Sequence, residues 1–235
     1  MKRSIAVIGF GPGVSQAVAE AFGAAGFALG LVARSDDRTA SSAAAFNAKG
    51  VAAASFKADA GNPDEIRAAI RQIRDLLGPV GVVFWNAFSG REAGDILVTD
   101  PQVTAQVFNV AVIGLLSAVQ EALPDLKAAG DGAVLITNGA MADLNPMIDQ
   151  WVIGTGAAGV ALANAAKTKL TGLLAARLKA EGVFVGEVMI AGAVKGTPTG
   201  DDVAIDPAEI AASFLDLYRS RDAVRARVTA QKPPL

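Results

Sequence analysis

Short apolar runs alternate with longer helical patterns along most of this chain. The apolar runs, which we expect to be strands, cover residues 5–8, 27–33, 51–56, 80–85, 133–137 and 183–190. The helical patterns cover residues 15–25, 37–48, 63–77, 101–129, 156–181 and 206–218. Strands that are apolar throughout are typical of a parallel sheet covered on both faces. The alternation therefore predicts an α/β fold, with a parallel sheet between two layers of helices.

A glycine-rich turn follows the first predicted strand. The sequence IAVIGFGPGVS (residues 5–15) runs from an apolar stretch through three glycines into a helical pattern. Glycine permits a tight turn because it has no Cβ, and a helix N-terminus offers unpaired N–H groups to phosphates. This context favours a dinucleotide site over an ordinary strand-to-helix turn. We expect a Rossmann-like doubly wound sheet of about seven strands, with cofactor contacts from Gly9, Gly11, Gly13 and Val14.

Composition narrows the chemistry that the chain can perform. It has 21 basic and 23 acidic residues, a net charge of −2, which argues against an extended nucleic-acid surface. The absence of cysteine and histidine excludes thiolate nucleophiles and cysteine-ligated metals and removes the commonest general base, so we expect no metal site. No linker or repeat divides the 235 residues, which suit one domain over residues 1–235. We expect no signal peptide, no membrane span and a cytoplasmic location, because glycine or charge interrupts the long apolar stretches.

In order and spacing, these landmarks resemble the short-chain dehydrogenase/reductase (SDR) superfamily over roughly residues 3–230. Gly9 and Gly13 match the first motif of the family, with Ser15 in place of its third glycine. The motif after the fourth strand reads NAFS (residues 86–89), where the family has NNAG, and the helix asparagine of the family fits Asn109. The resemblance implies a nicotinamide cofactor and hydride transfer to or from a small carbonyl or alcohol substrate.

The resemblance also implies contacts to that cofactor from the ends of the later strands. The sequence AGAV (residues 191–194) resembles the family segment after the sixth strand, with alanine for proline. The implied contacts are Asn86, Ala87, Phe88, Gly192 and Val194. Asp59 resembles the residue that contacts the adenine, although a turn cap is nearly as good an interpretation.

The end of the second predicted strand favours NADP(H) over NAD(H). An acidic residue there would accept hydrogen bonds from a free ribose 2′-hydroxyl. Here the strand is followed by Arg34 and Ser35, and the fork of donors on Arg34 suits a 2′-phosphate. Arg38 could assist, whereas Asp36 and Asp37 would repel the phosphate unless they serve only the start of the next helix.

The catalytic residues that the family uses are not in their places. Its chemistry needs a serine, a tyrosine and a lysine, with the last two spaced Tyr-x-x-x-Lys, and the one tyrosine here, Tyr218, has no lysine four residues later. Alignment from the end of the long helix places Val160 and Asn164 at the tyrosine and lysine positions. Alignment from the fifth strand places Trp151 and Thr155 there instead. Neither alternative restores the pair.

Other polar residues are candidates for the missing groups. Asn138 fits the serine position, with Thr137 beside it, and either could hydrogen-bond a carbonyl oxygen. With Asn109, Asn138 is our candidate catalytic residue. Asp143 or Asp149 could act as an acid or base if partly buried, and Lys167 could reach back toward the site, but solvated side chains are the simpler interpretation. Lys195 could contact a phosphate or an acidic substrate, or be an ordinary surface lysine.

Two classes of function fit this sequence. The first is an NADP(H)-dependent oxidoreductase of SDR type with a non-standard catalytic site. The second is a catalytically inactive nucleotide-binding or regulatory protein, and an interaction module without a ligand is a third, simpler alternative. In either main case we expect a homodimer or homotetramer, because SDR-like proteins pair through the long helices that match residues 103–122 and 157–178.

Overall fold

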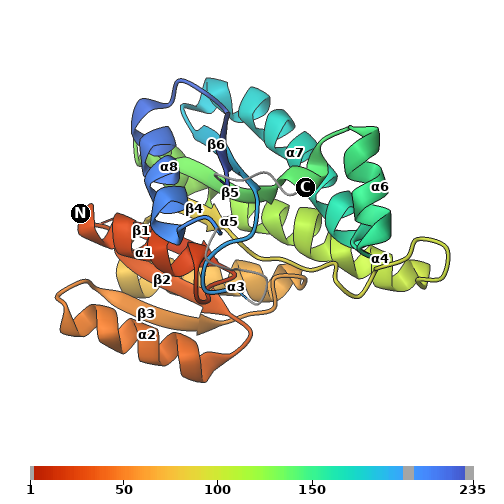
Figure 1. Cartoon of the computed structure of the whole chain (residues 1–235). Helices are drawn as coiled ribbons and strands as arrows, with labels where there is room; N and C mark the ends of the chain where they lie inside the picture. The colour runs from red at the N-terminus through yellow and green to blue at the C-terminus, as the bar shows by residue number, and fades with distance from the viewer. Residues whose placement is uncertain (1–2, 198–203, 231–235) are drawn as a thin grey trace.

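The computed structural model describes residues 3–197 and 204–230, which are built around one parallel sheet (Figure 1). The strands lie in the order β3-β2-β1-β4-β5-β6-β7, and every neighbouring pair is parallel. They are β1 (Ser4–Ile8), β2 (Ala28–Ala33), β3 (Ala53–Lys57), β4 (Val80–Trp85), β5 (Ala133–Gly139), β6 (Phe184–Ala191) and β7 (Arg225–Thr229). The Rossmann-like doubly wound α/β fold predicted from the sequence is confirmed.

Helices cover both faces of the sheet. They are α1 (Val14–Ala24), α2 (Asp36–Ala48), α3 (Pro63–Leu77), α4 (Pro101–Phe108), α5 (Leu115–Ala128), α6 (Pro146–Gly154), α7 (Ala158–Leu178) and α8 (Pro207–Ser220). Figure 1 shows α1 and α8 side by side, and with α2 they enclose an apolar cluster that contains Phe22 and Phe214. On the other face, α3, α5 and α7 enclose a second cluster that contains Ile70 and Leu115.

The central strands are largely apolar because helices cover both faces of the sheet. All five residues of β1 are buried. Ile5 and Val7 belong to the cluster under α1 and α8, whereas Ala6 and Ile8 belong to the cluster under α3 and α5. Alternate side chains of a strand point to opposite faces, so a doubly covered strand needs apolar residues at every position.

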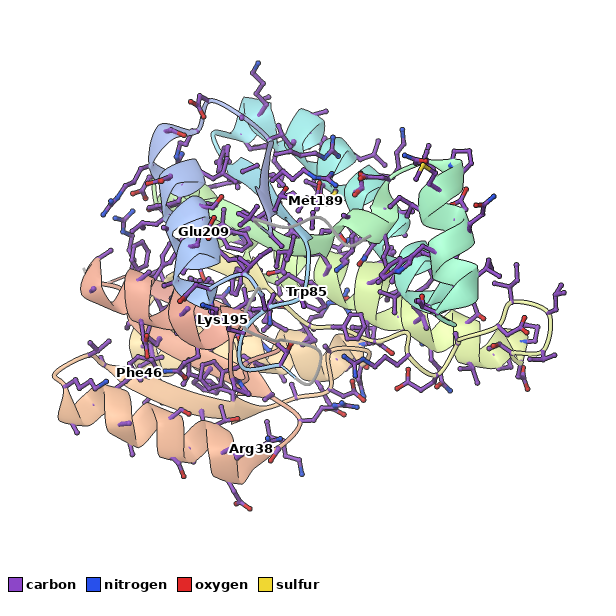
Figure 2. The ribbon with its side chains drawn as sticks, viewed as in Figure 1. Arg38, Phe46, Trp85, Met189, Lys195 and Glu209 are labelled. Carbon is purple, nitrogen blue, oxygen red and sulfur yellow. The ribbon has the colours of Figure 1, made fainter. Side chains whose placement is uncertain are left out.

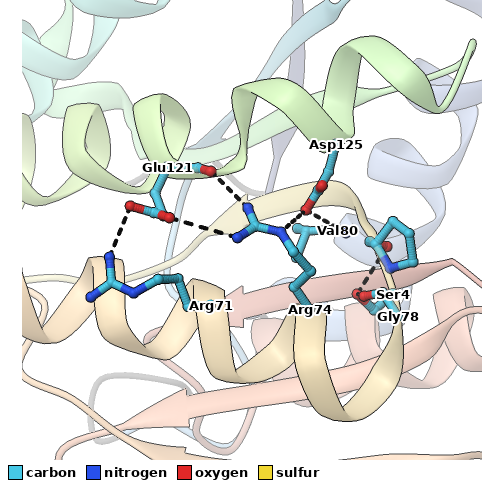
Figure 3. Close-up of polar contacts among 8 residues, drawn as sticks. Ser4, Arg71, Arg74, Gly78, Val80, Glu121 and Asp125 are labelled. Atoms are coloured by element: carbon cyan, nitrogen blue, oxygen red, sulfur yellow. Dashed lines mark hydrogen bonds and ion pairs between the residues drawn. The ribbon is translucent and has the colours of Figure 1, made fainter.

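Helix α3 illustrates how local sequence sets the element boundaries. The side chain of Asn62 accepts hydrogen bonds from the backbone N–H groups of Asp64 and Glu65, and Pro63 occupies the first turn. These are the signals of a helix start. The exposed side of α3 is tied to α5 by an ion-pair network, in which Arg74 Nε donates to Asp125 at 2.7 Å (Figure 3).

The stretch expected as one helix over residues 101–129 is divided. A π-helical segment, η1 (Asn109–Gly114), separates α4 from α5. Such segments are rare and frequently occur at functional sites. A side-chain carbon on Gly114 would overlap the carbonyl oxygen of Ala60, so the helix passes close to the loop after β3 at this point. Residues 101–128 are also long and apolar enough to cross a membrane by length and composition, with 39% of the apolar window buried in the fold.

Two elements differ from the sequence prediction. The stretch over residues 139–155, for which the sequence pattern predicted no helix, contains a short 3-10 turn, η2 (Ala140–Ala142), and helix α6. The seventh strand is β7, which follows the last predicted helix and pairs with β6 at the edge of the sheet. The alternating polar sequence of β7 fits an edge strand, because one of its faces meets water.

The single tyrosine of the chain has a structural role. The Tyr218 hydroxyl donates to Asp131 Oδ2 at 2.9 Å, and the Asp131 carboxylate also forms an ion pair with Arg3. The Tyr218 ring packs against Phe22 and Phe27, with ring centroids 5.4 and 5.8 Å apart. These contacts join the end of α8 to the start of β1 and of β5. They lie at the amino ends of the strands, whereas the glycine turn lies at the carboxyl ends.

Candidate functional site

The carboxyl ends of β1 and β4 meet where the strand order of the sheet reverses. The chain proceeds from β1 to β2 on one side, and β4 lies on the other side of β1. A side-chain carbon on Gly9 would lie 2.4 Å from the backbone nitrogen of Ala87, so only glycine fits there. The Asn86 amide donates to the Gly9 carbonyl oxygen at 3.2 Å and fixes this contact. Open α/β sheets hold their ligands at such a switch point.

The glycine turn leaves the start of α1 open to an anion. Gly9 and Gly13 have φ angles of 82° and 88°, which favour glycine. Within the described ranges, no hydrogen bond engages the N–H groups of Gly13 and Val14, and the first turn of α1 carries no acidic residue. Ser15, in place of the third glycine of the family, holds the turn by hydrogen bonds of 2.9 Å with the backbone of Gly11. This geometry fits a dinucleotide pyrophosphate.

Arg34 and Ser35 follow the carboxyl end of β2, and both are exposed. No ion pair of the described side chains uses Arg34. The pKa of the Glu92 carboxyl is held below its usual range, first by backbone hydrogen bonds from Glu92 itself and Gly90, and further by the charges of Arg34 and Arg91. Arg34 therefore lies within electrostatic reach of the loop after β4, and its guanidinium is free to bind a phosphate.

Asp59 caps the turn that follows β3. Its Oδ1 accepts from the N–H of Gly61 at 2.9 Å, and its own N–H donates to Glu65 at 2.8 Å. These contacts support the turn-cap interpretation of Asp59 and leave its other carboxylate oxygen at an exposed position beside the switch point. Asn109 lies near this turn, because a side-chain carbon on Gly61 would lie 3.7 Å from Asn109 Cβ.

The segment after β6 borders the glycine turn. A side-chain carbon on Gly13 would lie 3.8 Å from Thr197 Cγ2 and 4.0 Å from the Lys195 carbonyl oxygen. Figure 2 shows Lys195 on this segment, near the start of α1. Gly192 has a φ of 153°, and Val194 is buried and pairs with Ile205. The segment therefore lies against the glycine turn, although residues 198–203 lie outside the described ranges.

The side-chain amide of Asn138 is fully hydrogen-bonded within a buried polar network at the end of β5. Its Nδ2 donates to Glu187 Oε1 at 2.5 Å, to Thr168 Oγ1 at 2.9 Å and to the Asn164 carbonyl oxygen at 2.9 Å. Its Oδ1 accepts from the N–H of Gly139 at 3.0 Å. Both ends of the amide are thus engaged, and Asn138 is 3% exposed. A substrate carbonyl would have to share the Asn138 amide with these partners, and a catalytic role of Asn138 stays a prediction.

Glu187 is the centre of this network and was missed by the sequence analysis. It is 0% exposed, accepts from Asn138 and Thr168, and pairs with Arg225 Nε at 2.6 Å. A buried carboxylate needs such partners to remain charged. The signal in the sequence was a single acid within an otherwise apolar strand. Its partner Arg225 lies on β7, the strand that the sequence analysis did not predict.

Gly139, at the end of β5, packs against Asn164 of α7. A side-chain carbon at Gly139 would lie 2.7 Å from Asn164 Nδ2, so a larger residue there would displace the amide. Asn164 is 4% exposed, and no hydrogen bond of the described residues uses its side-chain amide. Val160, one turn earlier on α7, is buried. An almost buried amide without a partner is a candidate ligand contact.

Lys167 is buried rather than solvated, contrary to the simpler interpretation of the sequence. It is 5% exposed and donates to the Thr137 carbonyl oxygen at 3.0 Å. Burial lowers the pKa of its ammonium to about 8, and the charge of Glu187 partly opposes this shift. Thr137 Oγ1 and Trp85 Nε1 are buried nearby in the sheet without hydrogen-bond partners among the described residues.

The remaining candidates are not brought into this network. Asp143 forms an ion pair with Arg227 at 2.9 Å. Asp149 is exposed in the first turn of α6, and Trp151 is exposed on the same helix. Asn109 is exposed in the π-helical segment and has no hydrogen bond to Asn138 or Asn164 in the described ranges. No cluster of three or more acidic side chains in the described part of the chain could hold a metal ion.

Comparison with known proteins places this arrangement in a family. Residues 3–204 match the family described as short chain dehydrogenase. A metagenomic short-chain oxidoreductase in complex with NADP superposes with a TM-score of 0.79 at 21% identity, covering 99% of this chain and 97% of that chain. A Burkholderia cenocepacia J2315 short chain dehydrogenase in complex with NADP gives 0.84 at 20% identity, covering 97% and 96%.

A third solved structure has a sugar substrate as well as a cofactor. L-Sorbose reductase from Gluconobacter frateurii, complexed with NADPH and L-sorbose, superposes with a TM-score of 0.84 at 19% identity and covers 98% of this chain and 96% of that chain. At these identities the likeness shows the fold.

Proposed function

Because the chain belongs to the short chain dehydrogenase family, we propose that it is an NADP(H)-dependent oxidoreductase that acts on a small carbonyl or alcohol substrate. The observation that carries this proposal is the open glycine turn at the switch point. Gly9 packs against Ala87, Gly11 has open space beside it, and the N–H groups of Gly13 and Val14 have no partner in the described ranges. The open space beside Gly11 and the unpaired N–H groups of Gly13 and Val14 suit a diphosphate.

Different residues near the glycine turn would bind different parts of such a cofactor. Gly13 and Val14 would bind the diphosphate through their N–H groups, and Arg34 with Ser35 would bind a 2′-phosphate on the adenosine ribose. Asp59 would lie toward the adenine. The NADP complexes of two similar structures support this preference for NADP(H).

The other end of the groove would hold the nicotinamide. Asn86, Ala87, Phe88, Gly192 and Val194 border it. The nicotinamide supplies or accepts the hydride, and the protein binds and orients the reactants. Asn138 keeps the end of β5 in place through its contact with Glu187, and Asn109 stands in the π-helical segment at the side of the groove.

Two measurements test the proposal. Calorimetric titration of the full chain with NADPH and with NADH measures binding and preference. The loss of NADPH absorbance with a panel of aldehydes and ketones measures hydride transfer. Tight NADPH binding with turnover of at least one carbonyl supports the proposal. Tight binding without turnover of any of them would support the alternative below instead.

The alternative is a nucleotide-binding or regulatory protein without catalysis. It is favoured by the absence of a Tyr-x-x-x-Lys pair from the sequence, whether Val160 and Asn164 or Trp151 and Thr155 occupy those positions, and by Asn138 at the expected serine position. The open glycine turn argues against a scaffold that binds no ligand. Absence of binding to either nucleotide would refute both functions.

We also propose that the chain works as a single domain in a homodimer or homotetramer. Ile113 of the π-helical segment and Leu162 and Leu173 of α7 are more than 40% exposed, and a second subunit would cover such apolar side chains. Light scattering at micromolar concentration measures the state, and a monomer would overturn this assignment.

A further inference from the structure

Lys167 is the one cation in the described part of the chain that is almost fully buried. A lysine is rarely buried, because removing its ammonium from water costs free energy. Glu187, the nearest opposite charge, already has Arg225 as an ion-pair partner and two further donors, so the fold does not need Lys167 to neutralise it. A leucine or methionine would fill the same space without this cost. The position of Lys167 therefore calls for an explanation other than stability.

The ammonium of Lys167 retains unused donors. Lysine has three N–H bonds, and the described contacts use one of them, on the Thr137 carbonyl oxygen. A buried cation with unused donors indicates a further polar partner, such as a water or a ligand group. The unpartnered amide of Asn164 lies one turn away on the same helix.

The direction of the side chain places this ammonium under the candidate nicotinamide site. Side chains of an α-helix lean toward its N-terminus, and α7 begins at the carboxyl ends of the strands. The lysine side chain thus extends from position 167 toward Asn164 and Gly139. Its acceptor, Thr137, is two residues before the end of β5, at the level where β4 stops pairing.

Within the described part of the chain, the other titratable groups considered as a proton source have a different partner or position. Asp143 is paired with Arg227, and Asp149 is exposed. Tyr218 lies at the opposite end of the strands, near their amino termini. Among the charged groups of the elements packed on α7, Glu187 of β6 alone acts on the pKa of Lys167, and Arg225 of β7 faces Glu187. The pKa of Lys167, lowered by burial to about 8, is suited to proton exchange near neutral pH.

We propose that Lys167 is the proton source of this site, which deepens and rests on the proposed oxidoreductase function. In the reduction, hydride leaves the dihydronicotinamide and forms a C–H bond at the carbonyl carbon, and the π electron pair moves to the oxygen. The oxygen takes a proton from a water between the ammonium and the Asn164 amide, and this water takes one from Lys167. The neutral amine then regains a proton from solvent, so the step balances.

Three variants of the full chain test this role. Lys167→Met keeps the length of the side chain and removes the proton. Lys167→Arg keeps the positive charge, but a guanidinium does not release a proton at these pH values. Lys169→Met changes an exposed lysine of the same helix and is the matched control. The probes are NADPH with 4-nitrobenzaldehyde, ethyl acetoacetate and diacetyl.

We expect Lys167→Met to bind NADPH within about threefold of the unmodified chain and to lose about 100-fold or more in the rate of NADPH oxidation, the usual range for a lost general acid. Lys167→Arg should be as slow, whereas a purely electrostatic role would leave it active. The rate of the unmodified chain should fall above about pH 8, and this limb should be missing in Lys167→Met. Lys169→Met should behave as the unmodified chain.

A measurement without cofactor completes the test. In a chain labelled with ¹³C-lysine, one Cε resonance should titrate near pH 8 and be absent from Lys167→Met. If no lysine titrates there, or if Lys167→Met keeps the original rate and pH profile, the proposal is overturned while the oxidoreductase function stands. If the unmodified chain oxidises NADPH with none of the three carbonyls, the oxidoreductase function itself fails, and the role of Lys167 falls with it.

Discussion

Replacement of Lys167 by methionine should change how the stability of the fold depends on pH. The pKa of Lys167 is lowered by burial from 10.5 to about 8, so the unfolded chain holds this proton more tightly than the folded one. Stability therefore rises with pH between these two values, because the folded chain has lost this proton there while the unfolded chain still holds it. Below about pH 8 the lysine is charged in both states, and the cost of burying it is fully present.

The size of the effect follows from the shift. A difference of about 2.5 pKa units corresponds to about 3 kcal/mol at about 1.4 kcal/mol per unit. Between about pH 7 and about pH 10 most of this free energy, about 2–3 kcal/mol, should appear as a gain in stability of the unmodified chain relative to Lys167→Met. The comparison is made as a difference, because the two proteins share every other side chain.

Urea unfolding at a series of pH values measures this difference, since the unfolding free energy extrapolates linearly with denaturant. Lys169→Met is the control, because an exposed lysine has no burial cost to release. Two parallel curves for the unmodified chain and Lys167→Met would refute the assignment of a buried, titrating ammonium. A fall in the stability of the unmodified chain relative to Lys167→Met between about pH 7 and about pH 10 would refute its sign.

Four further substitutions test the cofactor site and the contacts at the amino ends of the strands. Arg34→Ala should weaken NADPH binding about 10- to 100-fold and leave NADH binding nearly unchanged, measured by calorimetry, because one charge-assisted phosphate contact is lost; equal weakening of both would remove the argument for NADP(H). Gly11→Ala should keep the unfolding free energy within about 0.5 kcal/mol but abolish nucleotide binding, whereas Gly9→Ala should cost on the order of 3 kcal/mol, because its Cβ would overlap Ala87. Tyr218→Phe should lower stability by about 1 kcal/mol through the lost bond to Asp131, with NADPH affinity unchanged; a loss of affinity would place Tyr218 in the site after all.

The parts of the fold predicted correctly are those specified by local sequence. Helix α3 and strand β4 begin and end where expected, because Asn62, Pro63 and Gly78 mark the helix ends. The glycine turn is equally local, and its place between strand and helix was enough to predict it. Helix α6 has comparable signals, since Asn145 caps it and Pro146 starts it, but the sequence analysis did not predict it.

The parts that were missed depend on contacts between distant segments. The break of the long helix at Asn109–Gly114 is invisible in an uninterrupted apolar pattern, and its cause includes the loop after β3. Strand β7 is short and half polar, and only its pairing with β6 makes it a strand. The bond between Asn138 and Glu187 joins residues 49 positions apart, so no local pattern could have assigned Asn138 to a network rather than to a substrate.

Helix α7 shows why the sequence alone did not distinguish a buried lysine from an exposed one. Lys167 and Lys169 are two residues apart, which places them on nearly opposite sides of a helix with 3.6 residues per turn, and one is buried while the other is exposed. The buried side also carries Asn164 and Thr171, so polarity alone does not mark the side that faces water. A helix that turns polar residues toward the sheet departs from the pattern that favours stability, and such departures are expected at functional sites. The same face of α7 therefore explains both the failure of the sequence interpretation and the place where chemistry is to be sought.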